Sequence, residues 1–380
     1  MRYDGEKLTT RWVMSQDPIE YLASRNSEQL AIKALAKIFQ NTTNCYKILL
    51  FKALLDSLGS PKAGNVSISF SSIAESMIFH AWYPLKYFRL SLGRQDGLVK
   101  IIDDISSSLR EEASRINKQQ LRLHIAQHLT EAHKVELLRY VPFRLLTPFF
   151  SEQLKGLPDH YKNRVIEELT EESFCSETPS LYMVSQSSDE VTIHSKWVRF
   201  LNENFLIFDG WCNFHWANFL QSRNPSVPAV IHKLAKPERR SSLNTQRKIW
   251  SSYLKRNAIE CVYTSEAIEA DNFSLDHVIP WSFVCHDYLW NLIPTSQSTN
   301  SSKGVVLPSV KELAIITEVQ FNFLNDMQHS QSERYRSRVF DEFINELKLD
   351  ERELLKWPRF KESYERSLFS LRDIAQHNGF

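Results

Sequence analysis

The chain has 380 residues, of which 42% are hydrophobic, 12% aromatic and 24% charged, and its formal net charge is +1. This composition excludes collagen-like, low-complexity and wholly disordered proteins, and the length predicts about two or three domains. A nearly neutral chain has little overall attraction for polyanions or anionic membranes, so any such affinity must come from a local patch of charge.

The cysteines and the N-terminal segment indicate the cellular compartment that we expect for this protein. The five cysteines are scattered and form no C-x-x-C pair, so neither a disulfide framework nor a paired-cysteine zinc site is expected. The segment MRYDGEKLTTRW lacks the apolar run of a signal peptide, and no stretch approaches the roughly 18 apolar residues of a membrane span. We therefore expect a cytoplasmic protein that does not enter the membrane.

Residues 1–150 are expected to be helical. Apolar residues recur at helical spacing from Glu28 to Leu58, from Ser67 to Phe79 and from Leu98 to Leu109. Pro84 is expected to stop the second of these stretches, because proline disfavours the helical conformation of the residue before it. The sequence thus predicts a helical N-terminal domain.

Residues 151–232 are expected to be a mixed connecting region. Helical spacing is already lost near 140–150, and short extended runs at Leu181–Val184 and Val191–His194 predict a pair of strands. Helical patterning then resumes near Lys196 and continues to the Asn224-Pro225 pair, which is expected to end it.

A basic segment follows, from Lys233 to Arg256, with eight Lys or Arg residues and a single acid. Its second half, Asn244 to Asn257, has helical spacing that would turn Trp250 and its apolar neighbours toward a core and the cations outward. By itself this pattern leaves open whether the cations meet phosphate or only solvent.

The candidate catalytic residues lie directly after the basic segment. Asp276 and His277 are adjacent, Asn291 follows His277 after 14 residues, and Asn300 follows Asn291 after 9 more. Lys303 comes three residues later, which places it on the same face of a helix as Asn300.

The local patterns predict strand, loop, strand and helix. Apolar and β-branched runs flank Asp276-His277 and Asn291, as expected of two short strands. The polar stretch from Thr295 to Lys303, between Pro294 and Gly304, is typical of a short exposed helix.

This pattern resembles the HNH, or ββα-metal, nuclease motif. It is most similar to the HNH domain of the CRISPR-associated RNA-guided DNA nuclease, which has the same spacings and also ends in Asn-x-x-Lys. The resemblance covers Cys261 to Val305. It implies an endonuclease that acts on DNA with Mg²⁺ or Mn²⁺ as cofactor.

The resemblance also implies roles for single residues. His277 would take the proton from the attacking water, and Asn291 would complete the catalytic pair by fixing the loop that orients this histidine. Asp276 and Asn300 would bind the metal, and Lys303 would reach a DNA phosphate.

These roles suit the residue types. An imidazole with its unperturbed pKa near 6.5 is a suitable general base at neutral pH. Because neighbouring side chains on a strand point to opposite sides, Asp276 and His277 can act separately. A carboxylate and an amide oxygen are hard ligands, which favours Mg²⁺ or Mn²⁺ over Zn²⁺.

Two features surround the motif. Next to such a site, the basic segment is expected to bind DNA phosphates and lead the backbone into the cleft, through Arg239, Arg240, Arg247 and Lys248. Many HNH proteins also hold the motif with two zinc-binding cysteine pairs, whereas here only Cys261 is near the usual place. Packing is therefore expected to hold this motif.

Together, the sequence predicts a mainly α protein with a small α+β insert. A helical N-terminal domain (1–150) and a mixed region (151–232) precede the basic helix and the HNH module (233–307). C-terminal helices (308–380) are expected to pack on that module.

The expected activity is nicking, because a single HNH site hydrolyses one strand at a time and the protein is expected to be a monomer. The N-terminal domain is expected to dock a protein partner. By analogy with other HNH proteins, such as the Zorya-type effector, we expect a role in anti-phage defence or restriction. Two alternatives remain open: an RNase, and a non-catalytic DNA-binding or scaffolding subunit with a vestigial HNH fold.

Overall fold

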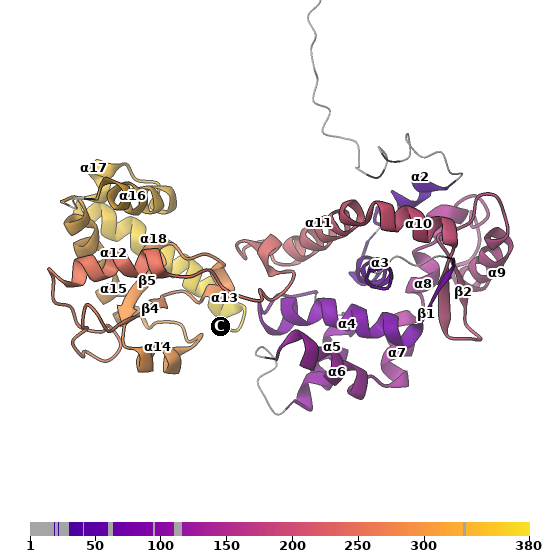
Figure 1. Ribbon diagram of the computed structural model, residues 1–380, viewed down its shortest axis with the longest axis horizontal. Helices are drawn as coiled ribbons and strands as arrows, with labels where there is room; N and C mark the ends of the chain where they lie inside the picture. The colour runs from indigo at the N-terminus through magenta and orange to yellow at the C-terminus, as the bar shows by residue number, and fades with distance from the viewer. Residues whose placement is uncertain are drawn as a thin grey trace, which may run out of the picture. The chain divides into compact units, whose positions relative to one another are not determined.

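The computed structural model describes residues 19, 22, 30–40, 42–59, 64–93, 96–109, 116–329 and 332–380. The start of the first predicted helix, at residues 28 and 29, lies outside the described residues. The chain forms two compact units, Met1–Trp82 with Leu92–Leu220 and Tyr83–Ser91 with Gln221–Phe380 (Figure 1). Residues 151–220 therefore pack with the N-terminal region in the first unit.

The first unit is mostly helical and contains one small sheet. Its strands are β1 (Val66–Ser69), β2 (Tyr182–Ser185) and β3 (Glu190–Ile193). The helices that begin in it are α2 (Ile32–Leu35), α3 (Tyr46–Asp56), α4 (Phe70–Lys86), α5 (Gly97–Ser107), α6 (Lys118–His128), α7 (Glu131–Leu138), α8 (Val141–Arg144), α9 (Lys162–Phe174), α10 (Ser195–Glu203), α11 (Phe205–Arg223) and the 3-10 turns η1 (Thr147–Phe150) and η2 (Asp159–Tyr161).

The sheet has the order β1-β3-β2 with antiparallel pairs throughout. The predicted pair at 181–184 and 191–194 is confirmed as β2 and β3. Strand β1 differs from the prediction, which placed Ser67 and the residues after it at the start of a helix. Val66 and Ile68 alternate inward with two serines, and this period-two pattern suits a strand that packs one face on a core.

Pro84 does not stop α4, which continues to Lys86. A proline in a helix lacks the donor N–H and crowds the carbonyl four residues earlier. Near the C-terminal end of a helix this disturbs only the last turn, so α4 ends two residues after the proline.

The second unit contains the predicted motif. Its strands are β4 (Ser274–His277) and β5 (Leu292–Thr295), paired antiparallel with Asp276 opposite Ile293 and His277 opposite Leu292. Its helices are α12 (Asn244–Leu254), α13 (Trp281–Val284), α14 (Gln297–Lys303), α15 (Val310–Met327), α16 (Glu333–Leu347), α17 (Glu351–Leu354), α18 (Trp357–His377) and the 3-10 turns η3 (Val230–Lys233) and η4 (Leu289–Asn291). The predicted order of strand, loop, strand and helix is present.

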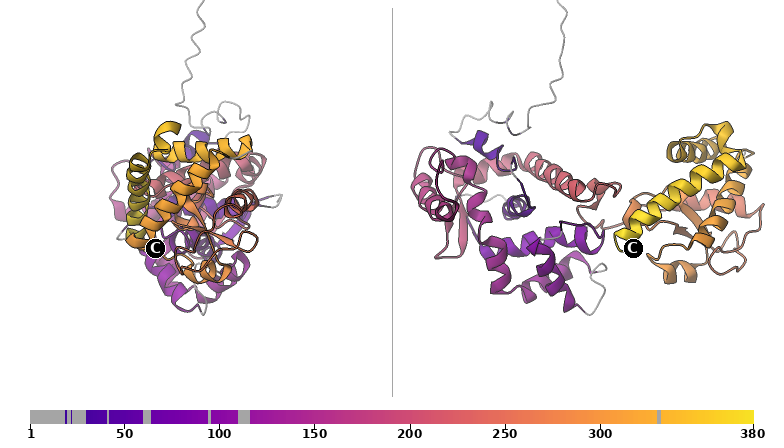
Figure 2. Two further views of the ribbon diagram at one scale, coloured as in Figure 1. Left: turned by 90° about the vertical axis from the view of Figure 1, so that its left-hand side faces the viewer. Right: turned by 180° about the vertical axis from the view of Figure 1, so that it is seen from behind.

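Helices from the C-terminal region hold the hairpin. α15, α16 and α18 pack against one another (Figure 2). Gln320 on α15 donates to the carbonyls of Leu289 (3.1 Å) and Leu292 (2.8 Å). On α18, Tyr364 donates to the carbonyl of Trp290 at 2.6 Å. Three backbone carbonyls of the η4–β5 segment are thus bound by buried side chains.

The aromatic residues near the motif lie in the core of this unit. Trp250 on α12 stacks on Phe323 of α15 with ring centroids 4.0 Å apart, and Trp290 is also buried. Aromatic packing therefore supports the motif, as expected from a sequence without paired cysteines. Among the helices that the structure describes, none is both long and apolar enough to cross a membrane.

Candidate active site

Asp276 and His277 end strand β4 and make contacts with different partners. The strand is short and half-buried, and successive side chains alternate between its two sides. Asp276 contacts Tyr263 and Lys303, whereas His277 contacts Asp287. The two adjacent residues therefore have separate surroundings.

The loop between the strands is fixed by Asn291, which is fully buried. Its Oδ1 accepts from the N–H of Ile279 and its Nδ2 donates to the carbonyl of Ile279, both at 2.9 Å. The N–H of Val278 donates to the carbonyl of Asn291 at 2.9 Å. Asn291 thus bonds the residues just after His277 to the start of β5.

His277 lies against a carboxylate that the motif pattern did not identify. Its Nε2 is 2.8 Å from Oδ1 of Asp287, and the two side chains are 11% and 19% exposed. Because an ionised carboxylate only accepts hydrogen bonds, a neutral His277 ring in this contact carries its proton on Nε2 and has its lone pair on Nδ1. Asp287 is in turn held by Gln246 of α12, whose Nε2 donates to its carbonyl at 3.0 Å.

Asp276 is almost completely buried, at 3% exposure. The Tyr263 hydroxyl donates to its Oδ2 at 2.7 Å, and the Lys303 ammonium lies 3.0 Å from the same oxygen. Burial, together with the nearby Asp276 carboxylate, raises the pKa of Tyr263 well above its usual range. Tyr263 therefore stays a hydrogen-bond donor, and its hydroxyl and Lys303 both bind one carboxylate oxygen.

Lys303 is placed on the face of α14 that meets β4, with a side chain only 7% exposed. Besides Asp276 it binds the carbonyl of His277 at 3.2 Å. The sequence-based role for Lys303 is contact with a DNA phosphate, and the structure gives it a buried partner instead. Contact with phosphate would require this ion pair to open.

Asn300 lies one turn before Lys303 on the same helix. Ser296 precedes the helix and caps it, because its hydroxyl accepts from the N–H of Thr299, and Gly304, with φ +55°, follows its last residue. Asn300 is half-buried, and its side-chain amide has no hydrogen-bond partner within the described part of the chain. Its oxygen is therefore available to a ligand.

The donor set decides which metal this site suits. Within the described residues no group of three His, Cys, Asp or Glu side chains comes together as a metal site. The Cys261 thiol contacts the Thr295 hydroxyl at 3.1 Å. The two groups that the motif assigns to a metal, the Asp276 carboxylate and the Asn300 amide, carry hard oxygens that would fit Mg²⁺ or Mn²⁺.

Comparison with known families gives a match for this segment. Residues 261–309 match the model of a family described as HNH endonuclease. We call this segment, which is similar to HNH endonucleases over residues 261–309, the HNH domain. Comparisons of the chain with curated proteins and with solved structures found no significant match. The match therefore covers the ββα unit, and the remaining residues are described by the structure alone.

Part of the basic segment forms a groove beside the HNH domain. The groove has a volume of about 600 Å³ and is lined by Arg247, Lys248 and Lys255 of α12 and by residues 270, 271 and 273. Arg247 lies over the ring of Phe273, 5.1 Å from its centroid. Since Phe273 directly precedes β4, the groove adjoins the strand that ends in Asp276 and His277.

The other predicted phosphate-binding residues lie elsewhere. Arg240 donates to the Tyr87 hydroxyl at 3.2 Å and lies over the Trp281 ring at 4.7 Å. Arg239 is exposed, and no contact joins it to the groove among the described residues. The structure thus brings Arg247 and Lys248 together, and it places Arg240 against Trp281, four residues after His277.

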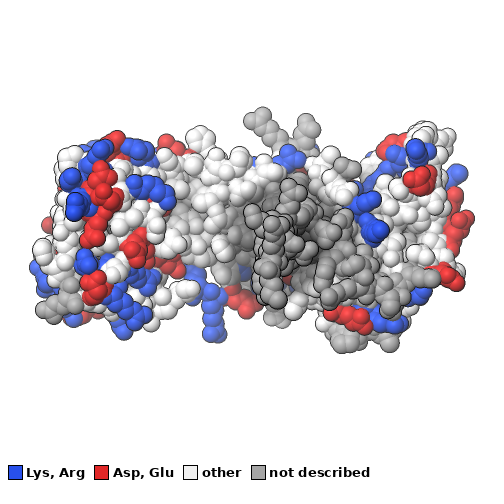
Figure 3. All heavy atoms as spheres, turned by 90° about the horizontal axis from the view of Figure 1, so that it is seen from above, with Lys and Arg blue, Asp and Glu red and all other residues white. Residues whose placement is uncertain are grey.

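Some charges of the basic segment are compensated. Lys233 is fully buried and donates to the carbonyl of Phe283 at 2.6 Å, and burial lowers its pKa to about 8. Lys255 pairs with Asp271 at 3.4 Å, and Arg256 pairs with Asp326. On the visible part of the face in Figure 3, basic and acidic side chains are interspersed. Ion pairs therefore compensate part of the positive charge of the basic segment.

Sequence reasoning missed two residues of this site, Asp287 and Tyr263. Asp287 is the only acid between His277 and Asn291, which is a signal that could have identified it. Tyr263 gives no such signal, since its contact with Asp276 depends on how the segment before β4 folds back.

Proposed function

We propose that this protein is a metal-dependent DNA endonuclease that nicks one strand at a time. The observation that supports this most directly is the pair Asp276 and His277 at the end of one strand, with separate partners, inside the HNH domain.

The general base in this proposal is His277. Its Nδ1 lone pair takes the proton from the attacking water, and Asp287 holds the ring through Nε2 and stabilises the imidazolium that forms. Asn291 keeps the loop after His277 in place. The base is thus oriented on one side by a carboxylate and on the other by a fixed backbone.

Asp276 and Asn300 would hold the metal ion in this proposal. A bound Mg²⁺ or Mn²⁺ supplies charge stabilisation for the phosphate and the leaving oxygen. Tyr263 orients the Asp276 carboxylate by donating to Oδ2. Lys303 compensates the buried carboxylate charge when no cation is bound there and would move toward a phosphate oxygen when one is.

The substrate contacts are proposed to begin in the groove on α12. Arg247 and Lys248 are exposed and without an acidic partner in the described part of the chain, so they can replace counterions on the DNA backbone. Arg240, and by proximity in sequence Arg239, would contact phosphates near Trp281.

One catalytic histidine serves one phosphodiester at a time, so a monomer would nick duplex DNA. We further propose a role in anti-phage defence or restriction, with the helical N-terminal region as the docking surface for a protein partner. These two proposals rest on analogy with other HNH proteins.

Two alternatives remain: a non-catalytic DNA-binding or scaffolding subunit, and an RNase. The experiment that separates them incubates the full chain with supercoiled plasmid or a structured RNA of equal mass, in Mg²⁺, Mn²⁺ or EDTA. We expect open-circular plasmid with either metal and none in EDTA. Cleavage of the RNA but not of the plasmid would mean that the protein is an RNase. Cleavage of neither would favour the non-catalytic subunit.

A further inference from the structure

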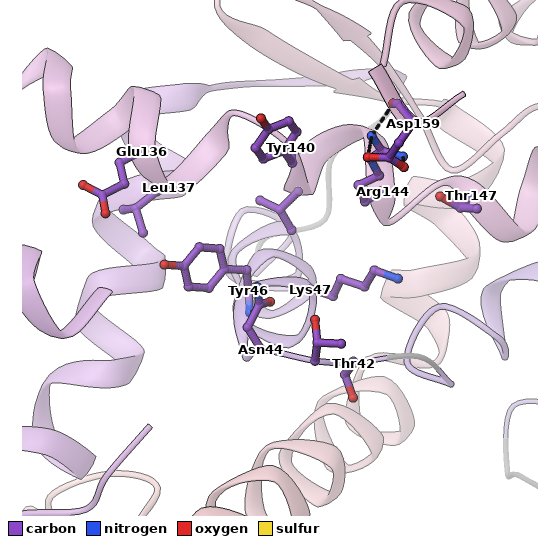
Figure 4. Close-up of a pocket in the computed structure, with 12 residues that line it drawn as sticks. Thr42, Asn44, Tyr46, Lys47, Glu136, Leu137, Tyr140, Arg144, Thr147 and Asp159 are labelled. Atoms are coloured by element: carbon purple, nitrogen blue, oxygen red, sulfur yellow. Dashed lines mark hydrogen bonds and ion pairs between the residues drawn. The ribbon is translucent and has the colours of Figure 1, made fainter. Parts of the chain in front are cut away.

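The first unit contains a cavity of about 440 Å³, which is separate from the nuclease residues. It lies where the start of α3 meets α7, α8 and the turns after them (Figure 4). This volume is within the range of small-molecule sites, which runs from roughly 300 to 1,000 Å³.

Neither of the two acids that line the cavity lies against the Lys47 ammonium. Asp159 binds the Arg144 guanidinium with both carboxylate oxygens, at 2.9 and 3.1 Å. Glu136 points toward Gly97 at the start of α5. Its Oε1 is so close to this glycine that a Cβ added there would lie 2.3 Å from it. In Figure 4, Glu136 lies on the opposite side of the cavity from the Lys47 ammonium. Neither acid therefore compensates Lys47.

Lys47 is the charge that lacks a counterion. Its ammonium points toward the side of the cavity where Arg144 and Thr147 lie (Figure 4), and within the described residues no carboxylate lies within 4.0 Å of it. Burial lowers the pKa of Lys47, and the nearby Arg144 lowers it further. An anion in the cavity would raise the pKa of Lys47, because its negative charge would stabilise the ammonium.

Neutral hydrogen-bonding groups surround this cation. The Thr147 hydroxyl lies on the side of the cavity to which the Lys47 ammonium points (Figure 4). Thr42 and Asn44 also line the cavity, but the Thr42 hydroxyl donates to the carbonyl of Phe39 and Oδ1 of Asn44 accepts from the N–H of Tyr46. The Lys47 ammonium and the Thr147 hydroxyl are donors of the kind that bind a tetrahedral phosphoryl group, and the Arg144 guanidinium can add those N–H groups that Asp159 does not occupy. The rest of the wall is apolar or aromatic, with Leu137, Val141 and the rings of Tyr46 and Tyr140.

We propose that this cavity binds a small molecule through a phosphoryl group, which lies at Lys47, Arg144 and Thr147. The organic part of the ligand packs against the rings of Tyr46 and Tyr140. Tyr140 is 50% exposed, so the ring-binding end of the cavity opens to solvent and accepts a ligand that extends outward.

Titration calorimetry on the full chain tests this proposal with three probes: adenosine 5′-monophosphate, inorganic phosphate and adenosine. We expect adenosine monophosphate to bind at one site, phosphate to bind there more weakly, and adenosine not to bind. Lys47→Gln should lower the affinity for adenosine monophosphate at least about tenfold, the effect of losing a charge-assisted contact. The matched control, Lys37→Gln, removes an exposed lysine near the same unit's α3 and should change nothing.

Thr147→Val is a second variant, which removes one donor and keeps the shape, and it should also weaken binding. Each contrary result overturns the proposal. Adenosine binding as tightly as its monophosphate would exclude phosphoryl recognition, and equal loss in Lys47→Gln and Lys37→Gln would place the site elsewhere. No binding of either phosphate probe at millimolar concentration would show that the cavity is not a phosphoryl site. Plasmid nicking is not the readout, so failure here leaves the proposed nuclease function unaffected.

Discussion

Oδ1 of Asp287 lies 2.8 Å from Nε2 of His277, so a carboxylate from the loop orients the ring of the proposed general base. We expect Asp287→Ala to slow plasmid nicking by about 10- to 100-fold, the usual loss when a partner that orients an active group is removed. The Mn²⁺ concentration for half-maximal rate should not change, because Asp287 is not a proposed ligand. Asp341→Ala, which removes an exposed acid of α16, is the control. An unchanged rate in Asp287→Ala would mean that His277 is oriented by the backbone alone.

Lys303 and Asp276 form a buried ion pair, with side chains 7% and 4% exposed. Lys303→Met leaves the carboxylate buried without its partner, which should cost about 3–5 kcal/mol of unfolding free energy in the absence of metal. Mn²⁺ should then raise the melting temperature of the variant more than that of the wild type, because the cation takes the place of the ammonium.

The control for this experiment is Lys361→Met, which removes a half-exposed lysine of α18. It should leave both melting temperature and metal response close to wild type. An equal Mn²⁺ shift in Lys303→Met and the wild type would contradict metal binding at Asp276.

Arg247 and Lys248 line the groove next to β4. Replacing both with glutamine should weaken DNA binding, and the slope of log affinity against log salt should become shallower by about two, one for each lost phosphate contact. Arg359→Gln with Lys361→Gln removes the same charge from α18 and should keep the wild-type slope. Fluorescence anisotropy with a labelled duplex measures both slopes, and identical slopes would mean that DNA does not lie in the groove.

Burial lowers the pKa of His286 to about 4, and the neighbouring His277 adds to this effect. The unfolded state binds this proton with a pKa near 6.5, so the unfolded chain takes up more protons between about pH 6.5 and pH 4. Acidification through this window should therefore lower stability, by up to about 3 kcal/mol from this group.

His286→Phe keeps the ring that packs on Tyr288 and Trp290 and removes the titration. Urea denaturation at about pH 7 and pH 5 should show a smaller loss of unfolding free energy in this variant than in the wild type. His329→Gln, at an exposed position of the same unit, should lose as much as the wild type. An equal loss of unfolding free energy in all three proteins would mean that the folded state does not lower the pKa of His286.

The ββα unit was predictable because its signals are local. The apolar runs around Asp276 and Asn291 set the two strands, and the polar stretch before Gly304 set the short helix. The spacing of three residues also placed Lys303 on the face of α14 that meets β4. What it meets there, the buried Asp276 carboxylate, follows from tertiary packing that spacing does not report.

Contacts between distant segments account for what the sequence did not show. β1 forms only because Val66 and its neighbours pair with β3, more than 120 residues later. Tyr263 reaches Asp276 through the fold of the segment before β4, and Lys233 is buried although its charge suggests a surface position. A charge run in sequence likewise did not reveal that Arg240 and Arg247 contact different aromatic side chains, Trp281 and Phe273.

The most direct test of the central claim is the initial rate of supercoiled plasmid nicking in Mg²⁺ by His277→Ala. The account predicts a rate at least about 100-fold below wild type, the low end of a general base's contribution, with the variant still folded and still binding DNA. His329→Ala, at an exposed position of the same unit, should keep the wild-type rate. A His277→Ala rate equal to wild type would contradict the assignment of His277 as the base and of this site as the nuclease centre.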